Sequence, residues 1–177
     1  MPEISIVIPV YNEEDNVLEA MRRIQAFMSL KDQPWECLIV NDGSRDRTER
    51  MVREALASEA YPNFCLLSDA TNRGKGFAVR QGVLASSGRM VLVTDVDLSS
   101  PIKEIEKLAK ALEEGYDIAI GSRAVHSPGC DVQQGFKRWL AGRIFNLFVR
   151  ALVLKGIADT QCGFKCFKKE AAHRLFT

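Results

Sequence analysis

Short apolar runs alternate with longer amphipathic stretches through the first 122 residues, and no other feature constrains the fold as strongly. The runs are rich in β-branched residues and end at polar or turn-forming residues, which is typical of buried strands. Between them, apolar residues recur at helical spacing. Strands are therefore expected at 4–10, 36–41, 63–69, 89–95 and 117–122. The alternation predicts an α/β fold with a mostly parallel sheet and helices on both of its faces.

Polar residues mark where several helices are expected to begin. Asn12 has the character of an N-cap, and the acidic residues 13–15 would form a first helical turn, where negative charge is favourable. Ser100 supplies a second cap, followed by Pro101 at a first-turn position. Gly115 then ends this helix. These signals separate the helices from the strands and leave polar clusters at the strand ends.

The alternation of strands and helices ends at about residue 123, where a loop precedes a long apolar stretch at 136–155. The arginines of this stretch fall mostly on one side, so it is either a core helix or an interfacial helix lying on a membrane. The whole chain has 177 residues, 46% hydrophobic and 27% charged, which suits one globular domain. Its net charge of +1 gives no reason to expect a nucleic-acid partner.

Cysteine usage and hydropathy bear on the compartment. The five cysteines are scattered, and their one close pair, Cys162 and Cys166, lacks the second pair that a zinc site needs. Reduced thiols in the cytosol are the simplest expectation. No signal-peptide pattern opens the chain, and no uncharged run reaches the roughly 18 residues of a spanning helix. A cytoplasmic protein is therefore expected.

Asp95 and Asp97 stand one residue apart directly after the apolar run "RMVLV". In an extended segment, residues i and i+2 point the same way, so both carboxylates are expected to face one spot at the sheet edge. Hard oxygen ligands suit Mg²⁺ or Mn²⁺, which proteins hold with one or two carboxylates together with substrate phosphates. Alternatively, Asp97 caps a turn and Asp95 bonds to nearby backbone. The two interpretations are close, and the buried run favours the metal.

Polar clusters also end the first two expected strands, where ligands bind in sheets of this kind. Tyr11 and Glu13 place a flat aromatic ring beside an acid, which suits a nucleobase and a ribose. Asp42 suits a base edge, with Gly43 allowing a close backbone approach, although Asp-Gly is also ordinary turn chemistry. The run "NRGKG" is not a phosphate-binding P-loop, and no Gly-x-Gly-x-x-Gly follows the first strand, which disfavours a nicotinamide or flavin site.

Six motifs follow one another in a fixed order, each at an expected strand end or in the loop after it. They are "PVYNEE", "NDGSRDRT", "NRGKGFAVRQG", "TDVDLSSP", "GSR" and "DTQCGFK". In this order the chain resembles the family 2 glycosyltransferases of the GT-A type, most closely the polyprenyl (dolichyl) phosphate glucosyl- and mannosyltransferases. The resemblance covers nearly the whole chain. It implies a Rossmann-like GT-A catalytic domain over 1–177, incomplete at its C-terminus, with a nucleotide-sugar-binding half at 1–122 and an acceptor-side half at 123–177.

The resemblance also implies a set of site residues. Asp97 would be the main ligand of a Mg²⁺ or Mn²⁺ ion on the donor diphosphate, with Asp95 beside it. Asp159 would act as base on a hydroxyl acceptor, or orient a lipid phosphate, which is already anionic at neutral pH and needs positioning more than proton removal. Lys165 would add cationic support. The positions implied to contact the donor are Pro9, Tyr11, Glu13, Val40, Asp42, Val96 and Arg123.

Three departures from the family pattern stand out. Asn41 replaces the first acid of the usual Asp-Asp-Gly-Ser, which we expect to change little. Ser99 stands where some relatives carry a glutamine that also reaches the metal. Relatives continue past Thr177 into another strand, a basic acceptor-side helix and often membrane spans. The chain is therefore expected to be a truncated form or to depend on a partner chain.

The expected function is metal-dependent, inverting transfer of a hexose from UDP-glucose or GDP-mannose to a polyprenyl phosphate, peripheral to the cytoplasmic face of a membrane. "TDVDLSSP" and "DTQCGFK" lean towards the glucosyl branch. One alternative is a family 2 enzyme with a saccharide hydroxyl acceptor, and another is a nucleotide-sugar-binding module without turnover, favoured by the missing acceptor-side sequence. A nucleotidyltransferase is disfavoured, because "YNEE" occupies the place of the glycine-rich, lysine-containing loop that such enzymes carry after the first strand.

Overall fold

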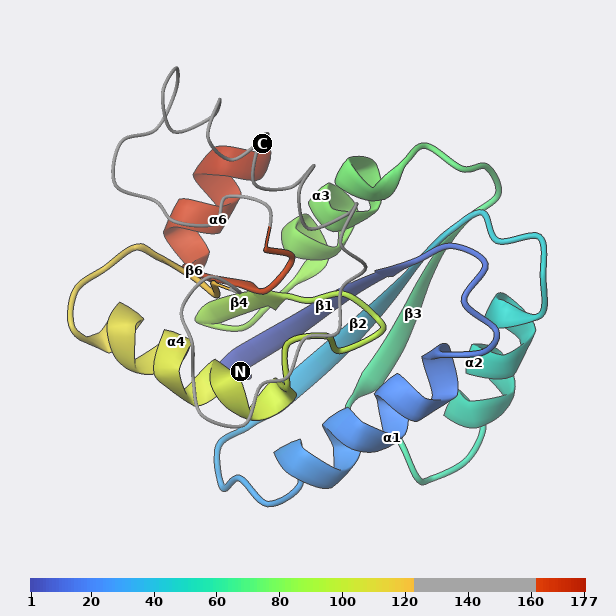
Figure 1. Cartoon of the computed structure of the whole chain (residues 1–177), viewed down its shortest axis with the longest axis horizontal. Coiled ribbons are helices and arrows are strands. Elements are labelled where there is room, and N and C mark those ends of the chain that lie inside the picture. Colours follow the sequence, from blue (N-terminus) through green and yellow to red (C-terminus); the bar gives the residue numbers. More distant parts are fainter. Residues whose placement is uncertain (123–161) are drawn as a thin grey trace, which may run out of the picture.

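The computed structural model describes residues 1–122 and 162–177, and these form one six-stranded sheet with helices packed on it (Figure 1). The strands are β1 (Ile4–Val10), β2 (Trp35–Asp42), β3 (Phe64–Asp69), β4 (Met90–Val93), β5 (Ile118–Ile120) and β6 (Lys165–Lys168). The helices are α1 (Val17–Met28), α2 (Thr48–Leu56), α3 (Lys75–Ala85), the 3₁₀ helix η1 (Ile102–Glu104), α4 (Ile105–Glu113) and α6 (Lys169–Phe176). The predicted helix at 136–155 lies outside the described residues.

The strand order is β3-β2-β1-β4-β6-β5. Strands β1 to β4 pair in parallel, as the alternation predicts, so the loops that follow them meet at one edge of the sheet. β6 runs antiparallel between β4 and β5, with Cys166 opposite Leu92 on one side and Ala119 on the other. The sequence predicts a short strand near the end of the chain but not its place between two earlier strands, because apolar periodicity does not specify partners.

The core has two layers of helices, one on each face of the sheet (Figure 1). Alternate side chains of β1 enter opposite layers: Ile6 and Ile8 pack with α1, α2 and α4, whereas Val7 packs with α3 and α6. α3 lies close against β1 and β2 because Gly82 has no side chain. A Cβ at this position would come within 2.9 Å of Val40 Cγ2. The predicted α/β architecture with helices on both faces is confirmed.

Helix starts differ from the prediction in two places. α1 begins at Val17, because Asn12 adopts a left-handed backbone (φ 54°) and its side-chain oxygen accepts the backbone N–H of Arg45. The predicted N-cap at Asn12 is therefore wrong: its side chain binds the neighbouring loop instead of the helix. Pro101 is extended (ψ 136°) and stands before η1, and no side-chain cap from Ser100 forms there.

Candidate functional site

Hydrogen bonds join the segment 12–14, which follows β1, to the segment 44–48, which follows β2. Backbone N–H groups of the first segment donate to side chains of the second: Asn12 N to Ser44 Oγ at 3.0 Å, Glu13 N to Thr48 Oγ1 at 2.8 Å and Glu14 N to Asp46 Oδ2 at 3.1 Å. In the other direction, Arg45 N donates to Asn12 Oδ1 and Arg47 N donates to Glu14 Oε2. The two loops therefore form one hydrogen-bonded unit at the edge of the sheet.

This unit presents the residues expected to contact a nucleoside. Tyr11 is 40% exposed at the end of β1, and Pro9 is half-buried just before it. The Glu13 carboxylate is partly exposed and accepts a hydrogen bond from Asn16 Nδ2 at 2.8 Å. All three lie where a ligand could reach them, and their contacts with a donor stay predictions.

Asp42 and Gly43 hold the loop that carries "NRGKG". The Asp42 carboxylate, 2% exposed, accepts the backbone N–H groups of Arg73 at 2.8 Å and Gly74 at 2.7 Å. Gly43 has φ 68°, and a Cβ there would lie 2.6 Å from the backbone nitrogen of Asn72. The close backbone approach expected at Gly43 is thus made by the chain's own loop. Contact between Asp42 and a base stays a prediction, and the structure adds this positioning role.

Val40 and Val96, both expected to contact the donor, are buried. Val40 has no exposed surface and packs with α3, while Val96 is 7% exposed and packs into the opposite layer. Strand geometry explains Val40, since alternate residues of a central strand point into the two cores. Both side chains support the site from beneath, so a contact with a donor would have to come from the backbone of these residues, and it stays a prediction.

The acid pair lies on a turn instead of an extended strand. β4 ends at Val93, and Leu98 N donates to Asp95 O at 3.2 Å, so the extended geometry predicted for Asp95 and Asp97 is wrong. Burial still alternates along the turn: Val96 and Leu98 are 7% and 3% exposed, Asp95 is half-buried and Asp97 is exposed. The two apolar side chains therefore anchor the turn in the core and leave both acids on its solvent side.

Three motifs meet at Asp95. Its Oδ1 forms an ion pair with the Nζ of Lys75 from "NRGKG". Its carboxylate also lies over Gly163 from "DTQCGFK", where a Cβ would come within 2.7 Å of Asp95 Cγ. Sequence reasoning missed both residues as parts of the site, although both stand in motifs that mark the family. The loop of Lys75 does not fit the P-loop pattern, so no phosphate-binding motif points to this lysine.

The Asp97 side chain caps the turn on which it lies. Its Oδ1 accepts the backbone N–H of Ser99 at 2.9 Å, so the turn-capping interpretation is correct for this residue. This bond occupies one carboxylate oxygen and fixes the direction of the side chain. The other oxygen, Oδ2, forms no hydrogen bond or ion pair with the described residues. Turn capping and metal binding are thus compatible at Asp97.

The acid pair can offer carboxylate oxygens to a divalent cation whose remaining ligands come from elsewhere. Among residues 1–122 and 162–177 no group of three or more His, Cys, Asp or Glu side chains gathers at one point. Two carboxylates are nevertheless the usual protein share of a Mg²⁺ or Mn²⁺ site whose other ligands are phosphate oxygens and water. The Lys75 ammonium beside Asp95 indicates that this position attracts positive charge.

The remaining predicted residues divide into two groups. Lys165 lies in β6 opposite Val93, the last residue of β4, which places it at the same sheet edge as the acid pair. Arg123 and Asp159 lie outside the described residues, so their roles stay predictions. In the described part of the chain, no helix has both the length and the apolar character needed to cross a bilayer.

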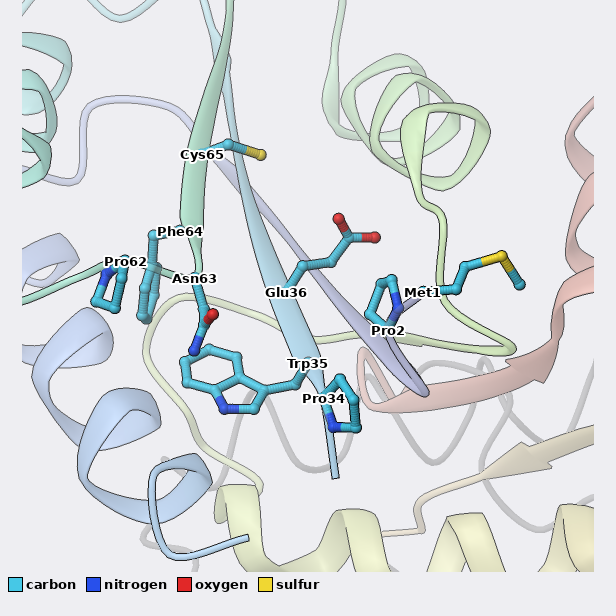
Figure 2. Close-up of a pocket in the computed structure, with 9 residues that line it drawn as sticks. All are labelled: Met1, Pro2, Pro34, Trp35, Glu36, Pro62, Asn63, Phe64 and Cys65. Atoms are coloured by element: carbon cyan, nitrogen blue, oxygen red, sulfur yellow. The ribbon is translucent and has the colours of Figure 1, made fainter. Parts of the chain in front are cut away.

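A shallow pocket of about 410 Å³ lies at the opposite edge of the sheet (Figure 2). It is lined at the starts of β2 and β3 by Trp35 and Phe64, whose rings meet edge to face at 5.5 Å, and by neighbouring prolines. In Figure 2 the Glu36 side chain and the Trp35 ring extend to opposite sides of β2. This pocket is separate from the acid pair, because β2 and β3 begin at one edge of the parallel sheet and the motifs follow their other ends.

Comparison with known proteins assigns the family. The model for "Glycosyl transferase family 2" matches residues 5–176. The chain belongs to glycosyl transferase family 2. Within the family it is 35% identical to dolichyl-phosphate beta-glucosyltransferase ALG5D of Trichomonas vaginalis, over 98% of this chain and 55% of the relative. It is 33% identical to the human dolichyl-phosphate beta-glucosyltransferase, over 99% of this chain and 57% of the relative.

A bacterial family 2 relative is also similar. The undecaprenyl-phosphate 4-deoxy-4-formamido-L-arabinose transferase of Serratia proteamaculans is 32% identical, over 94% of this chain and 49% of that protein. The chain thus spans about half the length of the curated relatives that it matches.

Solved structures support the GT-A fold. The mannosyltransferase PcManGT from Pyrobaculum calidifontis, in complex with GDP-Man and Mn²⁺, has a TM-score of 0.67 at 21% identity, covering 98% of this chain and 46% of that one. Glucosyl-3-phosphoglycerate synthase from Mycobacterium tuberculosis, in complex with Mn²⁺, UDP and glucosyl-3-phosphoglycerate, has a TM-score of 0.66 at 22% identity, covering 96% and 57%. The predicted fold class and family are therefore confirmed.

Proposed function

We propose that this chain is the donor-binding and catalytic part of a glycosyltransferase that moves a hexose from a nucleotide sugar to a polyprenyl phosphate. The observation that carries the proposal is the 33–35% identity to dolichyl-phosphate beta-glucosyltransferases over nearly the whole chain. The geometry agrees with it, because the acid pair, the loop of Lys75 and the strand ends of β1 and β2 share one sheet edge, where α/β sheets bind ligands.

Glucose is the preferred sugar in this proposal and UDP-glucose the first donor to test. The Trichomonas vaginalis and human relatives, 35% and 33% identical over the aligned residues, are both named as glucosyltransferases. UDP-glucose carries its sugar in the α configuration, so a β-glucosyl product corresponds to one inversion at the anomeric carbon. Inversion also agrees with the family precedent for a direct displacement.

Breaking the bond between the sugar and the diphosphate leaves negative charge on the departing nucleotide. A divalent cation, when bound, neutralises that charge. Asp97 would hold it, with Ser99 N–H fixing the direction of the carboxylate. Asp95 would add a second oxygen ligand. The Lys75 ammonium group, which is paired with Asp95 here, would contribute positive charge beside the phosphates. Arg123 is proposed to face the same phosphates.

A polyprenyl phosphate is already anionic near neutral pH, because its second pKa is about 6. It can therefore attack the anomeric carbon without losing a proton to the protein, provided that it is held in line. In this proposal Asp159 orients the acceptor, and Lys165, the first residue of β6, adds cationic support. The lipid tail of the acceptor would hold the reaction at a membrane surface. We propose the cytoplasmic face, a reducing compartment in which the four cysteines among the described residues would remain free thiols.

The test uses the chain as it stands. UDP, GDP and ATP are titrated with and without Mn²⁺, and the chain is then incubated with labelled UDP-glucose or GDP-mannose and a polyprenyl phosphate. We expect Mn²⁺-dependent UDP binding, transfer of glucose to the lipid, and loss of both in Asp97→Asn. UDP binding without lipid product would instead support a nucleotide-sugar-binding module. In a parallel incubation with a saccharide acceptor, transfer to the saccharide and not to the lipid would support the hydroxyl-acceptor alternative. Preference for ATP would contradict the proposal.

A further inference from the structure

We propose that Gly163 is a positioning residue for Asp95: its bare backbone forms the space in which the Asp95 carboxylate sits, and any side chain there displaces that carboxylate from the cation position. The inference rests on the proposed function, since it assigns the acid pair to a divalent cation. It gives the last motif, "DTQCGFK", a role in the donor half of the site. Nothing in the sequence pattern of that motif indicates such a role.

The space at Gly163 is taken up by one side chain. A Cβ built on Gly163 would come within 2.7 Å of Asp95 Cγ and 2.9 Å of Asp95 Oδ1, and closer still to Oδ2. All three distances are below the separation that real Cβ atoms show. Gly163 does not have a positive φ, unlike Gly43, Gly74 and Gly115. Its backbone conformation is therefore open to other residues, and the requirement for glycine comes from the Asp95 carboxylate.

The backbone at Gly163 has little freedom to retreat. Its neighbours Cys162 and Phe164 are each 2% exposed and belong to the core. Phe164 O also accepts the backbone N–H of Gly121 at 2.8 Å, and β6 begins one residue later, at Lys165. A side chain at 163 would therefore push on Asp95 more readily than on its own strand.

Asp95 is also held from its own side. The buried side chains of Val96 and Leu98 anchor its turn, and Lys75 pairs with its Oδ1. A displaced carboxylate would thus turn away from Gly163 by a side-chain rotation, while the turn keeps its place. The expected result is a folded chain whose nucleoside-contacting segments are intact but whose cation ligand points in the wrong direction.

The first experiment separates cation binding from nucleotide binding in Gly163→Ala. We expect UDP affinity measured with Mn²⁺ to fall by about tenfold or more, as is typical when a residue that orients a metal ligand is lost, while UDP affinity without metal changes less than about twofold. Ser58→Ala, at the exposed C-terminal end of α2 and outside the six motifs, is the control, and it should bind as the unaltered chain does. Equal Mn²⁺-dependent binding in Gly163→Ala would overturn the inference.

A second experiment tests the contact without any ligand. Thermal midpoints are measured for Gly163→Ala, Asp95→Ala and the double variant. If the added methyl collides with the Asp95 carboxylate, Gly163→Ala lowers the midpoint in the unaltered background and costs much less when Asp95 is already alanine. Equal losses in both backgrounds would overturn the inference. Absence of Mn²⁺-dependent UDP binding in the unaltered chain would refute the proposed function and the positioning role, while the midpoint cycle would still report the contact.

Discussion

The amide group of Asn41 is enclosed at the end of β2, with no surface exposed. Its Nδ2 donates to Glu49 Oε2 at 3.0 Å and to Ser68 Oγ at 2.9 Å, and its Oδ1 accepts the backbone N–H of Ser44 at 3.1 Å. The pKa of Glu49 is lowered, chiefly by the hydrogen bond from Arg53, with Ser68 and Asn41 also contributing. An ionised aspartate could not donate these bonds. Asn41 therefore has a specific hydrogen-bonding role at the end of β2, and the expectation that it changes little in function stays a prediction.

Asn41→Asp is expected to lower the free energy of unfolding near neutral pH by about 1–3 kcal/mol. The new buried carboxylate would lie beside the Glu49 carboxylate, and neither group could donate a hydrogen bond to the other. This repulsion raises the folded-state pKa of the new acid above its unfolded value. The loss should therefore be full at high pH and shrink as pH falls through that raised pKa. Urea unfolding near pH 7 and near about pH 5 measures it.

The control for this prediction is the double variant Asn41→Asp with Glu49→Gln. A glutamine at 49 can donate to the new carboxylate, so most of the lost stability should return. A single variant whose cost is the same at both pH values, with no recovery in the double variant, would contradict the role given to this pair.

At the scale of elements, the segments that follow β1 and β2 are held in place by hydrogen bonds to each other more than by the helices that follow them. The segment 12–14 is fixed by side chains of the segment 44–48, and Thr48 is central to this contact. Thr48 is fully buried, accepts the backbone N–H of Glu13 at 2.8 Å and donates to Asp46 Oδ1 at 2.6 Å. The geometry of "YNEE" is thus set by the loop after a different strand.

Thr48→Val keeps the shape of this side chain but removes the hydroxyl, so the Glu13 amide loses its acceptor. We expect hydrogen exchange of the peptide covering 11–16 to accelerate by about fivefold or more, corresponding to a hydrogen bond of about 1 kcal/mol. Exchange followed by mass spectrometry measures it. Ser58→Ala, which removes a hydroxyl at the exposed end of α2, should leave the same peptide unchanged. Unchanged exchange in Thr48→Val would show that the loops hold each other by other contacts.

At the scale of the whole molecule, the two edges of the sheet differ in what they do. The carboxyl ends of the parallel strands carry the motifs, whereas the amino ends are tied together by Glu36. Its Oε1 accepts hydrogen bonds from Ser5 Oγ in β1 and from the backbone and hydroxyl of Ser87, in the loop before β4. Burial raises the pKa of Glu36, but these hydrogen bonds together outweigh burial and leave the pKa below its ordinary value.

A lowered folded-state pKa means that the ionised form of Glu36 stabilises the fold. This contribution is complete above the unfolded-state pKa of about 4.3 and is lost as pH falls through the lower folded-state value. Glu36→Gln should therefore be less stable than the unaltered chain near neutral pH, with the difference shrinking below about pH 4. Urea unfolding across this range measures it, with the exposed Glu113→Gln as control. A difference that does not vary with pH would contradict the assignment.

The sequence by itself determined the strand–helix alternation and the edge of the sheet at which the motifs lie. Both depend on local information: apolar period specifies the element, and a parallel arrangement brings successive carboxyl ends together. The same local reasoning found Asp95 and Asp97 but gave them an extended backbone, because it could not show that β4 ends at Val93. Local sequence also predicts a helix cap at Asn12, because the residue that its side chain binds, Arg45, lies beyond α1 in the sequence.

Only the tertiary structure decided which distant residues meet. β6 enters between β4 and β5 and brings Gly163 under Asp95, and the loop held by Asp42 brings Lys75 to the same carboxylate. These contacts depend on how the layers pack, because the position of a carboxylate is set by the space and the charges that surround it. No periodicity within a single element carries that information, so the partners of Asp95 became apparent only when the strands were in place.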